Sequence, residues 1–529
     1  MKNYLSLSFL LIPFITAAQV GFIDSTFGTN GIVFPSDGLF KGRMESYDAM
    51  TLQPDGKILL AGVAWNSEPP YSDVAVMRLR VNGQRDPFFG DGGLVRSDVD
   101  NGFQTGRGIA LQPDGKILVV SVSDSESPSN LFRYLPNGDP DPSFGNNGRA
   151  AMPLVGFPTY NYNNHNALAL QSDGKIVVSG SVNNATQGAF FMYRFLPDGS
   201  MDASFGDNGL VIADVTPGDE YCSDMFIQPD GKIVLAGYTE PNTYNPRFTL
   251  MRFWPSGDFD PDFGDGAGYV ITEVPGYIDC YAYSAKLQAD GKIVTVGAGL
   301  YGLAPTIIDN IITRHNPDGT PDTSFGNGGI SIVYFDNILE CWSTNLDLQA
   351  DGKLLVNGYC RTGFDQDLAV YRYWPDGAID TSFGLGGFNF IDLGSYSDQS
   401  YTCLISGDRL LVAANRSEEY WTVLAYQLEA STATSEPSPA RLMQVFPNPV
   451  SRQTVTLSLD LIRPAEIRVV LYDLQGRLAG VLWSGEWPSG PLEKALSLPP
   501  ALPEGLYFLA IEGENWTNTV KLSVGNQRR

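Results

Sequence analysis

Histidine, the side chain most used for acid–base and metal chemistry near neutral pH, occurs only twice in this sequence, at His165 and His315. Any Ser-His-Asp triad, Cys-His pair or histidine metal site would have to be built on one of them. His315 takes the aromatic position of a repeated sequence motif, which here reads Arg-His-Asn-Pro at 314–317, so we interpret His315 as structural. His165 precedes a predicted inner strand, and we expect it to hydrogen-bond at a rim rather than to catalyse a reaction.

Carboxylates are plentiful, and a pair of them could hydrolyse glycosides. Most of the aspartates recur in every repeat, however, and a ring of repeats has only one axial site, so the recurring ones are structural. The acid and base candidates that do not recur are Asp48, Arg107, Glu220 and Asp224. Nothing in the sequence places these four together, so we assign no catalytic residue, and the pattern favours a protein that is not an enzyme.

The metal and cofactor signals are weak. The Asp-Gly-rich turns leave calcium open as a bound ion, but no loop matches an EF-hand or nonapeptide calcium pattern. The many glycines form no phosphate loop, because none of them precedes a helix. We therefore predict no cofactor and no metal ligand.

Two short sequence motifs, called the first and second words below, recur along the chain with a period near 60 residues. The first, Gln-x-Asp-Gly-Lys, stands at Gln53–Lys57, Gln112–Lys116, Gln171–Lys175, Gln228–Lys232, Gln288–Lys292 and Gln349–Lys353, with a degenerate seventh copy at Ser406–Arg409. The second, Asp-x-x-Phe-Gly, begins at Asp24, Asp86, Asp141, Asp202, Asp260, Asp322 and Asp380. A fixed period of this size indicates one supersecondary unit repeated seven times.

Each repeat contains four strand-like segments. In the second copy these are residues 109–112, 116–120, 131–135 and 148–152. The Asp-Gly and Pro-x-Gly dipeptides between them suit tight hairpin turns. Four antiparallel strands per unit, repeated seven times, predict an all-β fold with a seven-bladed β-propeller. The segment before each Gln is predicted as the inner strand and the one after Phe-Gly as the outer strand.

The two ends of the repeat region complement each other. The chain starts with an outer strand that has no blade of its own, within residues 24–34, and its last repeat stops after a third strand at 421–428. We predict that the first strand completes the last blade, which leaves no open sheet edge. The repeated phenylalanines of the second word are expected to pack between blades, and its aspartates to cap the turn.

The places where the repeat varies are the candidate contacts. Aromatic and polar residues stand just before the inner strands and would gather at one mouth of the channel, where they suit carbohydrate or peptide binding. They are Tyr47, Asp48, Arg107, His165, Asn166, Tyr221, Tyr281, Tyr283, Trp342 and Tyr401. The alternative is that they are ordinary packing and loop residues.

Composition and charge restrict the partners and the compartment. The net charge of −25 argues against nucleic acid, whose phosphates require a basic surface. Residues 1–18 are typical of a cleaved export signal, and no later stretch has the roughly 20 apolar residues that span a bilayer. Of the five cysteines, Cys341 and Cys360 flank a hairpin turn; a disulfide between them stays open, because their register is about two residues from direct opposition.

Together, Asp-x-x-Phe-Gly-x-x-Gly, Leu-Gln-x-Asp-Gly-Lys-Ile and Arg-Tyr-x-Pro-Asp-Gly resemble the delta-60 repeat, a propeller-type repeat of secreted bacterial proteins. The resemblance covers about residues 24–428, with six of the seven copies close to the pattern. It implies the propeller fold and carries no catalytic residues that could be transferred to this chain.

The C-terminal part reads as a Ser-, Thr- and Pro-rich linker, residues 429–444, followed by a small β-sandwich at 445–529. Four landmarks in this order resemble the type A C-terminal sorting domain of the type IX secretion system. Their residues are Phe446, Pro447, Asn448, Pro449, Asp473, Gly476, Gly505, Tyr507, Lys521 and Val524. This resemblance implies the secretion machinery as a partner and passage across the outer membrane, although the chain continues beyond the usual Lys-x-x-Val ending.

These patterns predict a secreted or cell-surface binding module, possessing no transmembrane span and no affinity for nucleic acid, whose ligand is an extracellular glycan or peptide. The alternatives are a hydrolase or lyase that acts at the channel mouth and a ring that only spaces other surface components.

Overall fold

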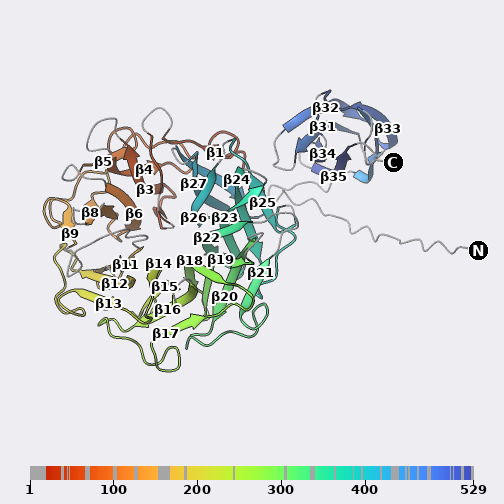
Figure 1. Ribbon diagram of the computed structural model, residues 1–529. Helices are drawn as coiled ribbons and strands as arrows, with labels where there is room; N and C mark the ends of the chain where they lie inside the picture. Colours follow the sequence, from red (N-terminus) through yellow and green to blue (C-terminus); the bar gives the residue numbers. More distant parts are fainter. Residues whose placement is uncertain are drawn as a thin grey trace, which may run out of the picture. The chain divides into compact units, whose positions relative to one another are not determined.

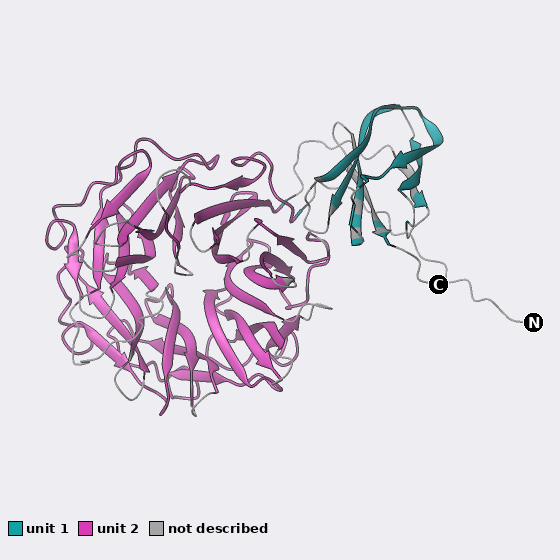
Figure 2. Cartoon of the chain, turned by 45° about the horizontal axis from the view of Figure 1, so that its top comes forward, with its two compact units in different colours: residues 1–20, 429–529 teal, residues 21–428 magenta. Residues whose placement is uncertain are grey.

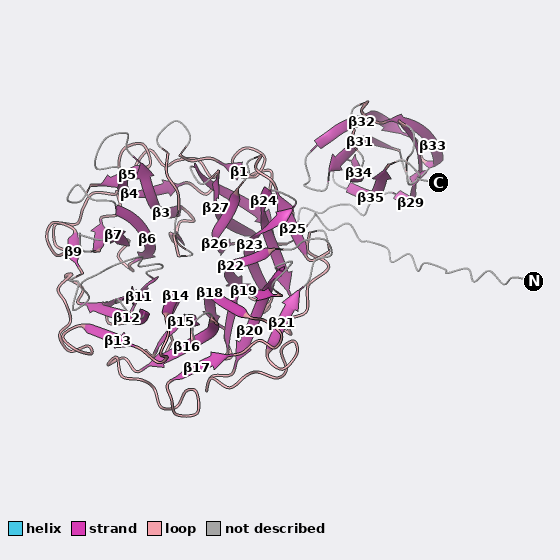
Figure 3. Cartoon of the chain, in the orientation of Figure 1, coloured by secondary structure: helices cyan, strands magenta, loops and turns pink. Residues whose placement is uncertain are grey.

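The computed structural model describes all residues except 1–19, 37–40, 45, 47, 66–71, 99–103, 124–128, 153–166, 184–187, 242–244, 303–306, 334–339, 363–364, 385, 395–396, 418–419, 430–439, 447–449, 451–452, 462–463, 474–477, 501, 504, 514–516 and 526–529. The expected export signal therefore lies outside the described residues. Two compact units are present, one formed by residues 21–428 and one that contains residues 429–529 (Figure 2). The described residues form strands and loops without a helix (Figure 3), so none of them belongs to a helix that could span a membrane.

The first unit is the predicted seven-bladed β-propeller, built from seven four-stranded antiparallel sheets arranged in a ring (Figure 1). The first three blades, from inner to outer strand, are β2 (Met50–Leu52), β3 (Ile58–Trp65), β4 (Ser72–Leu79) and β5 (Leu94–Ser97); β6 (Gln104–Leu111), β7 (Ile117–Ser123), β8 (Asn130–Tyr134) and β9 (Arg149–Ala151); and β10 (Ala167–Leu170), β11 (Ile176–Asn183), β12 (Gly188–Phe195) and β13 (Leu210–Ala213). The next three are β14 (Glu220–Ile227), β15 (Ile233–Thr239), β16 (Arg247–Phe253) and β17 (Tyr269–Thr272); β18 (Asp279–Leu287), β19 (Ile293–Tyr301), β20 (Ile307–His315) and β21 (Ile330–Val333); and β22 (Cys341–Leu348), β23 (Leu354–Thr362), β24 (Asp365–Tyr373) and β25 (Phe388–Ile391). The seventh consists of β26 (Asp398–Ser406), β27 (Arg409–Arg416), β28 (Tyr420–Gln427) and β1 (Ile32–Val33).

The seventh blade confirms the predicted closure, because its outer strand comes from the start of the chain. Ile32 pairs with Leu424 and Val33 with Val423. The contact extends further, since the Asp24 amide donates to the carbonyl of Ala425. The ring is thus closed by antiparallel pairing between segments separated by almost the whole repeat region.

The first repeated word forms the turn between the inner and second strands. In the second blade the Gln112 amide donates to the carbonyl of Lys116 over 2.8 Å, and the Gly115 amide donates back to Gln112 over 2.9 Å. Gly115 adopts φ 83°, a conformation that an L side chain rarely takes, which explains the glycine. The Asp114 carboxylate accepts the Lys116 amide and so fixes the turn.

The second word is joined to the first by an ion pair. Asp141 Oδ1 accepts the Ser143 amide over 3.0 Å, while Oδ2 accepts Arg133 Nε over 2.7 Å and lies 3.3 Å from Lys116 Nζ. The Arg133 guanidinium lies 4.3 Å from the Phe144 ring centroid and donates to the Pro197 carbonyl of the next blade. The same Lys–Arg–Asp group occurs in six blades. The two words recur together because they form one blade-to-blade clamp.

The repeated phenylalanines fill the spaces between blades, as predicted. All seven (Phe27, Phe89, Phe144, Phe205, Phe263, Phe325 and Phe383) have no exposed surface. Phe144, for example, belongs to a core cluster with Leu118 of its own blade and Ile176 of the next. Burial of one such side chain contributes about 1.5–3 kcal/mol, so the seven together hold the blades in place.

The C-terminal unit is the predicted β-sandwich, made of a three-stranded and a four-stranded sheet. Their strands are β29 (Ala440–Phe446), β30 (Thr454–Leu461) and β33 (Gly490–Ser497), and β32 (Leu478–Trp487), β31 (Ala465–Asp473), β34 (Gly505–Gly513) and β35 (Thr517–Val524). Leu459 and Leu471, one from each sheet, are fully buried in a shared core. Strand β29 begins at Ala440, inside residues 429–444 that the composition assigned to a linker, because the apolar residues of that segment pair with β30.

The landmark residues of the sandwich lie on several elements. Gly505 and Val524 pair across β34 and β35, and Tyr507 is buried with its hydroxyl donating to the Pro503 carbonyl. Phe446 ends β29 and is exposed, Asp473 ends β31, and Lys521 lies in β35. Pro447, Asn448, Pro449 and Gly476 are outside the described residues.

Candidate ligand-binding site

The inner strands of the seven blades surround the centre of the ring. Each of β2, β6, β10, β14, β18, β22 and β26 is the edge strand of its sheet, and each contacts the inner strand of the next blade until β26 meets β2 (Figure 1). Residues of these strands that differ between blades therefore come together around one axis. The sequence could predict this grouping because the repeat defines equivalent positions.

A β-bulge interrupts the inner strand in five blades. The register shifts at Ser223 in β14, Tyr283 in β18, Thr344 in β22 and Tyr401 in β26, and over residues 107–108 in β6. A bulge adds one unpaired residue, bends the strand and re-aims a side chain. Three predicted site residues, Arg107, Tyr283 and Tyr401, occupy these bulges.

Six half-buried aromatic side chains form a continuous row across the fourth, fifth and sixth blades, which we call the aromatic arc. Its members are Tyr221, Tyr238, Tyr281, Tyr283, Trp342 and Tyr359. Tyr238 stacks on Tyr221 with ring centroids 4.8 Å apart and meets Tyr281 edge-to-face at 5.0 Å. Trp342 lies 6.3 Å from Tyr281, 6.2 Å from Tyr283 and 6.4 Å from Tyr359. The arc therefore joins three blades through ring contacts alone.

Glycines opposite the inner strand allow this arrangement. A Cβ at Gly237 would lie 1.9 Å from the Tyr221 carbonyl oxygen, and one at Gly358 would lie 1.8 Å from that of Trp342. The hairpin backbones approach so closely beside the bulge that any side chain would force them apart. Tyr238 and Tyr359 directly follow these glycines and pair opposite Tyr221 and Trp342.

The structure brings four of the ten predicted site residues into the arc, namely Tyr221, Tyr281, Tyr283 and Trp342. Tyr401 lies on the next blade and donates its hydroxyl to Gln399. Tyr47, His165 and Asn166 are outside the described residues. Sequence reasoning missed Tyr238 and Tyr359, which lie on second strands; the Gly-Tyr dipeptide before a blade's second loop is the signal that could have found them.

The arc is uncharged near neutral pH. Burial raises the pKa of Tyr281 to about 12 and raises the pKa of Tyr238 and Tyr359 further above the usual value. The phenols thus remain protonated and offer ring faces together with neutral hydrogen-bonding groups.

A second group lies on the inner strands near the axis, formed by Asp48, Asp224, Lys286 and Asp347. Asp224 Oδ2 accepts the Ser284 hydroxyl and the Ala285 amide of the next blade and lies 3.9 Å from Lys286 Nζ. Asp347 Oδ2 likewise accepts the Ile405 amide of the blade after it. These carboxylates tie neighbouring inner strands together, which is a structural role.

The charges of this axial group shift one another's protonation. Burial, together with the nearby Asp224 carboxylate, raises the pKa of Asp48 to about 7. Burial alone would lower the pKa of Lys286, but the carboxylates of Asp224, Asp48 and Asp347 raise it. Two of the four non-recurring acid and base candidates, Asp48 and Asp224, therefore lie near enough for their charges to interact. Asp224 is already engaged by hydrogen bonds from the fold.

The other two candidates are Glu220 and Arg107. Glu220 is fully buried, and its Oε1 accepts the Val215 and Thr216 amides, so it caps the loop that precedes β14. Burial raises the pKa of Glu220 to about 7. Arg107 is buried on the β6 bulge. The bonds that Glu220 accepts give it a structural role.

Because Asp48 has a higher pKa folded than unfolded, it should make the ring less stable as the pH rises. Between about pH 4 and pH 7 the folded state holds a proton that the unfolded state has lost, so the stability contribution falls across this window. At pH 7.5 we expect Asp48→Asn to raise the free energy of unfolding by about 1–3 kcal/mol, because the neutral side chain avoids this loss. At pH 4 we expect the substitution to change the free energy of unfolding little. Urea unfolding as a function of pH measures the slope. Asp173→Asn is the matched control, since Asp173 is exposed and its pKa is lowered.

The sixth blade carries the one cysteine pair whose bonding the sequence left open. Cys341 and Cys360 form a disulfide and lie directly opposite each other on β22 and β23. The bulge at Thr344 removes the register offset that argued against this bond. The disulfide neighbours Trp342 and Tyr359 in sequence and clamps the hairpin at the arc. Cys222, Cys280 and Cys403 are free and buried.

No group of three or more His, Cys, Asp or Glu within the described ranges is placed to hold a metal ion. His315 lies at the end of β20, where its Nε2 is 2.9 Å from the Thr272 hydroxyl and burial lowers its pKa to about 4. This is the structural role that its place in the repeat predicted.

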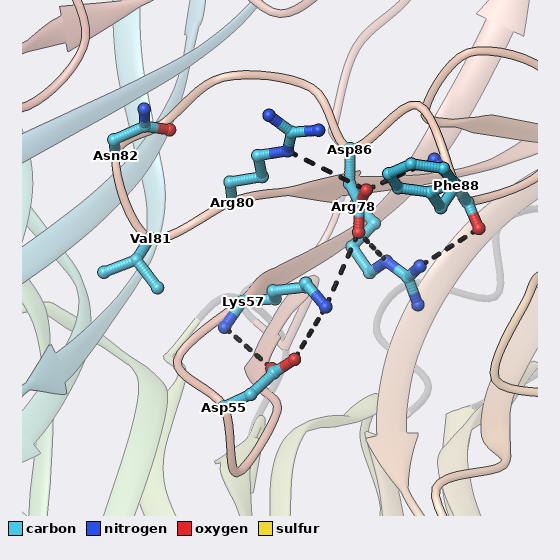
Figure 4. Close-up of a pocket in the computed structure, with 8 residues that line it drawn as sticks. All are labelled: Asp55, Lys57, Arg78, Arg80, Val81, Asn82, Asp86 and Phe88. Carbon is cyan, nitrogen blue, oxygen red and sulfur yellow. Dashed lines mark hydrogen bonds and ion pairs between the residues drawn. The ribbon is translucent and has the colours of Figure 1, made fainter.

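A hollow of about 500 Å³ opens in the first blade between the β2–β3 turn and the segment that follows β4 (Figure 4). It is lined by Asp55, Lys57, Arg78, Arg80, Val81, Asn82, Asp86 and Phe88. Figure 4 shows Arg78 and Lys57 directed at Asp86, the same clamp that six blades share. Because six blades contain the same Lys–Arg–Asp group, we interpret this hollow as part of the structural framework.

Comparison with solved structures finds distant likenesses only. Among solved structures, the polysaccharide lyase Uly1 covers 72% of this chain and 90% of its own at 11% identity and a TM-score of 0.43. Drosophila Semaphorin 2a covers 96% and 100% at 8% identity and a TM-score of 0.43. Likenesses at this level carry no argument about function. A search of curated proteins gives no significant match.

A family model described as a domain of unknown function (DUF5122) beta-propeller matches six segments of the chain. They are residues 53–89, 112–144, 171–205, 228–263, 288–325 and 349–383, and each runs from the first repeated word to the phenylalanine of the second. These six segments thus match the DUF5122 beta-propeller repeat, at a period of about 60 residues, and small C-terminal sheets follow them.

Proposed function

We propose that this protein is a secreted or cell-surface binding module whose aromatic arc holds an extracellular glycan or peptide. The observation that carries the proposal is the arc itself, six half-buried rings in mutual contact over three blades. Half-exposed aromatic faces beside hydrogen-bonding groups are typical of surfaces that recognise sugars and peptides. The arc also breaks the repeat, whereas the residues that hold the ring together recur in it.

A hydrolase or lyase at the channel mouth is the second candidate, and the axial group of Asp48, Asp224 and Lys286 is the observation in its favour. An acid with a pKa near 7 whose charge interacts with that of a lysine has protonation states that acid–base catalysis uses. The oxygens of Asp224, however, accept bonds from Met225, Ser284 and Ala285, so this carboxylate serves the fold. The third alternative, a ring that only holds other surface components apart, would not require the aromatic arc.

Binding is tested with the full chain on glycan and peptide arrays, comparing the natural protein with Tyr281→Ala/Trp342→Ala. These two rings link the blades of the arc, so we expect the double variant to lose its array signals by about tenfold or more. Phe446→Ala, on the other unit, is the control and should bind normally. Signals that survive the double variant would refute the arc as the binding surface.

We also propose that the C-terminal sandwich directs export through the type IX secretion machinery. Support comes from the order of its landmark motifs and from its separate core. Removing residues 446–529 should leave the protein in the periplasm, because the sorting unit is then lost, and cell fractionation measures this. Continued display at the cell surface would contradict the assignment.

A further inference from the structure

The three blades of the aromatic arc share a second feature on their inner strands. An acid stands two residues before the ring of each blade: Asp219 before Tyr221, Asp279 before Tyr281 and Glu340 before Trp342. Side chains two apart on a strand lie on the same face. The ladder is continuous at these positions, since the Glu240 amide donates to the Asp219 carbonyl and the Arg361 amide to that of Glu340. The backbone therefore carries each acid on the side of the inner strand that bears the ring, and the Asp219 carboxylate accepts the Gly188 amide of the third blade over 2.8 Å.

A fourth acid completes the pattern on the second strand of the fourth blade. Glu240 stands two residues after Tyr238, opposite Asp219, and so lies on the face of the stacked Tyr221 and Tyr238. We call Asp219, Glu240, Asp279 and Glu340 the acidic rim. Equivalent positions of the first, second and seventh blades carry Met44, Phe103 and Ser397, so the rim coincides with the arc and is no general property of the repeat.

Among the residues that the structure describes, Arg247 and Arg361 are cations near the rim, and both these cations and the acids Asp219 and Glu340 have partners in the fold. Arg247 Nη1 donates to the Ile278 carbonyl over 2.6 Å, and Arg361 Nη1 bonds Glu340 Oε1 over 2.9 Å. In the axial group, the carboxylates of Asp224 and Asp347 likewise outnumber Lys286. The electrostatic field at the arc is therefore negative, in a protein whose net charge is −25.

We propose that the aromatic arc and the acidic rim together bind a positively charged ligand, an arginine- or lysine-rich segment of another protein. The inference rests on the proposed binding function and specifies its ligand. A guanidinium or ammonium group gains from the face of a tyrosine or tryptophan and from a neighbouring carboxylate at the same time. An acidic polysaccharide would meet the rim with like charge, which costs affinity.

The inner-strand edge favours recognition through side chains. Adding a peptide as an extra strand requires an uninterrupted row of free backbone groups, and the bulges at Ser223, Tyr283 and Thr344 break that row in all three blades. Basic side chains reaching the rings and the rim remain compatible with this geometry.

The test measures binding of synthetic dodecapeptides to the full chain by calorimetry at low salt. The probes are an Arg-Gly-Ser repeat, its Glu-Gly-Ser counterpart and a glucosamine hexamer. The rim variant is Asp219→Asn/Asp279→Asn/Glu340→Gln, which removes three charges and keeps the shapes. The control is Asp230→Asn/Asp290→Asn/Asp351→Asn, the same charge change in the same blades at the turn end of the hairpins, where these side chains are more than half exposed.

We expect the arginine peptide to bind the natural protein and the turn control equally, and to bind the rim variant about tenfold more weakly or worse. Its affinity should also fall with added salt, and the glutamate peptide should not bind. Equal binding of the arginine peptide to the rim variant, or its failure to bind the natural protein, would overturn the proposal. Rim-dependent binding of the glucosamine hexamer alone would move the assignment to a cationic glycan.

The two proposals fail in different ways. If the Tyr281→Ala/Trp342→Ala protein loses a ligand that the rim variant retains, the arc is the binding surface and the charge preference is wrong. If the arc variant retains every ligand, the arc itself is refuted. Thermal melting of each variant checks that the ring stays folded.

Discussion

Deletion of residues 24–34 should lower the melting temperature of the whole ring by about 5–10 °C, in one transition. The deletion removes Phe27, which is fully buried, and the strand that pairs with β28. It also removes a contact with the first blade, where the Gly28 amide donates to the Asn82 carbonyl in the connection between β4 and β5. Because every blade is supported by two neighbours, opening the circle at one point weakens all of it. Differential scanning calorimetry measures the shift.

Two controls separate closure from the loss of a few contacts. Phe27→Ala alone should cost about 3–5 kcal/mol or less, because the strand still pairs. A synthetic peptide of residues 20–36, added to the deleted protein, should restore part of the melting temperature by pairing with β28. An unchanged melting temperature after deletion would mean that the first strand does not close the ring.

Breaking one blade-to-blade clamp is the second large effect that we expect. Asp260 has no exposed surface, and its Oδ2 accepts Arg252 Nε over 2.6 Å and lies 3.1 Å from Lys232 Nζ. Asp260→Asn leaves the buried Arg252 without its counter-charge, which typically costs about 3–5 kcal/mol. Urea unfolding at neutral pH measures the loss.

The pH dependence and a matched position give this prediction its control. Burial alone would raise the pKa of Asp260, but bonds from the Asp262 amide, Lys232 and Arg252 lower it. The stabilisation is therefore present above about pH 4 and lost as the pH falls below it, so the Asn variant should differ least from the natural protein in acid. Asp24→Asn should cost less free energy of unfolding than Asp260→Asn. In the seventh blade Ala425 stands where the other blades have the arginine, and Asp24 pairs with the more exposed Arg409. Equal costs at Asp24 and Asp260 would contradict the clamp.

The architecture could be predicted from the sequence because the repeat shows it seven times. The turn motif, the aspartates and the phenylalanines from Phe27 to Phe383 recur in the blades, and this distinguishes them from residues that differ between blades. The first strand has no blade of its own, which predicts that it closes the ring. The sequence also placed Tyr221, Tyr281, Tyr283 and Trp342 together, since equivalent positions in a ring share one axis.

The pairings that could not be predicted from the sequence depend on one-residue shifts in strand register. The bulge at Thr344 places Cys341 opposite Cys360, and the same kind of bulge brings Tyr238 opposite Tyr221. A bulge leaves no motif of its own, so neither pairing followed from counting residues. The approach of Asp48 to Asp224, three blades apart, needs the closed ring as well.

The recurring aromatic residues hold the ring together and the non-recurring aromatic residues of the arc are the proposed contacts, and one pair of variants tests this division. Phe263→Ala and Tyr281→Ala each remove an aromatic ring, the first a recurring residue and the second an exception, from adjacent parts of the ring. Calorimetry combined with array binding should show a large loss of melting temperature and retained ligand for the folded Phe263→Ala protein. It should show lost ligand and a smaller change in melting temperature for Tyr281→Ala. A Tyr281→Ala protein that binds as before but melts as early as Phe263→Ala would contradict the account.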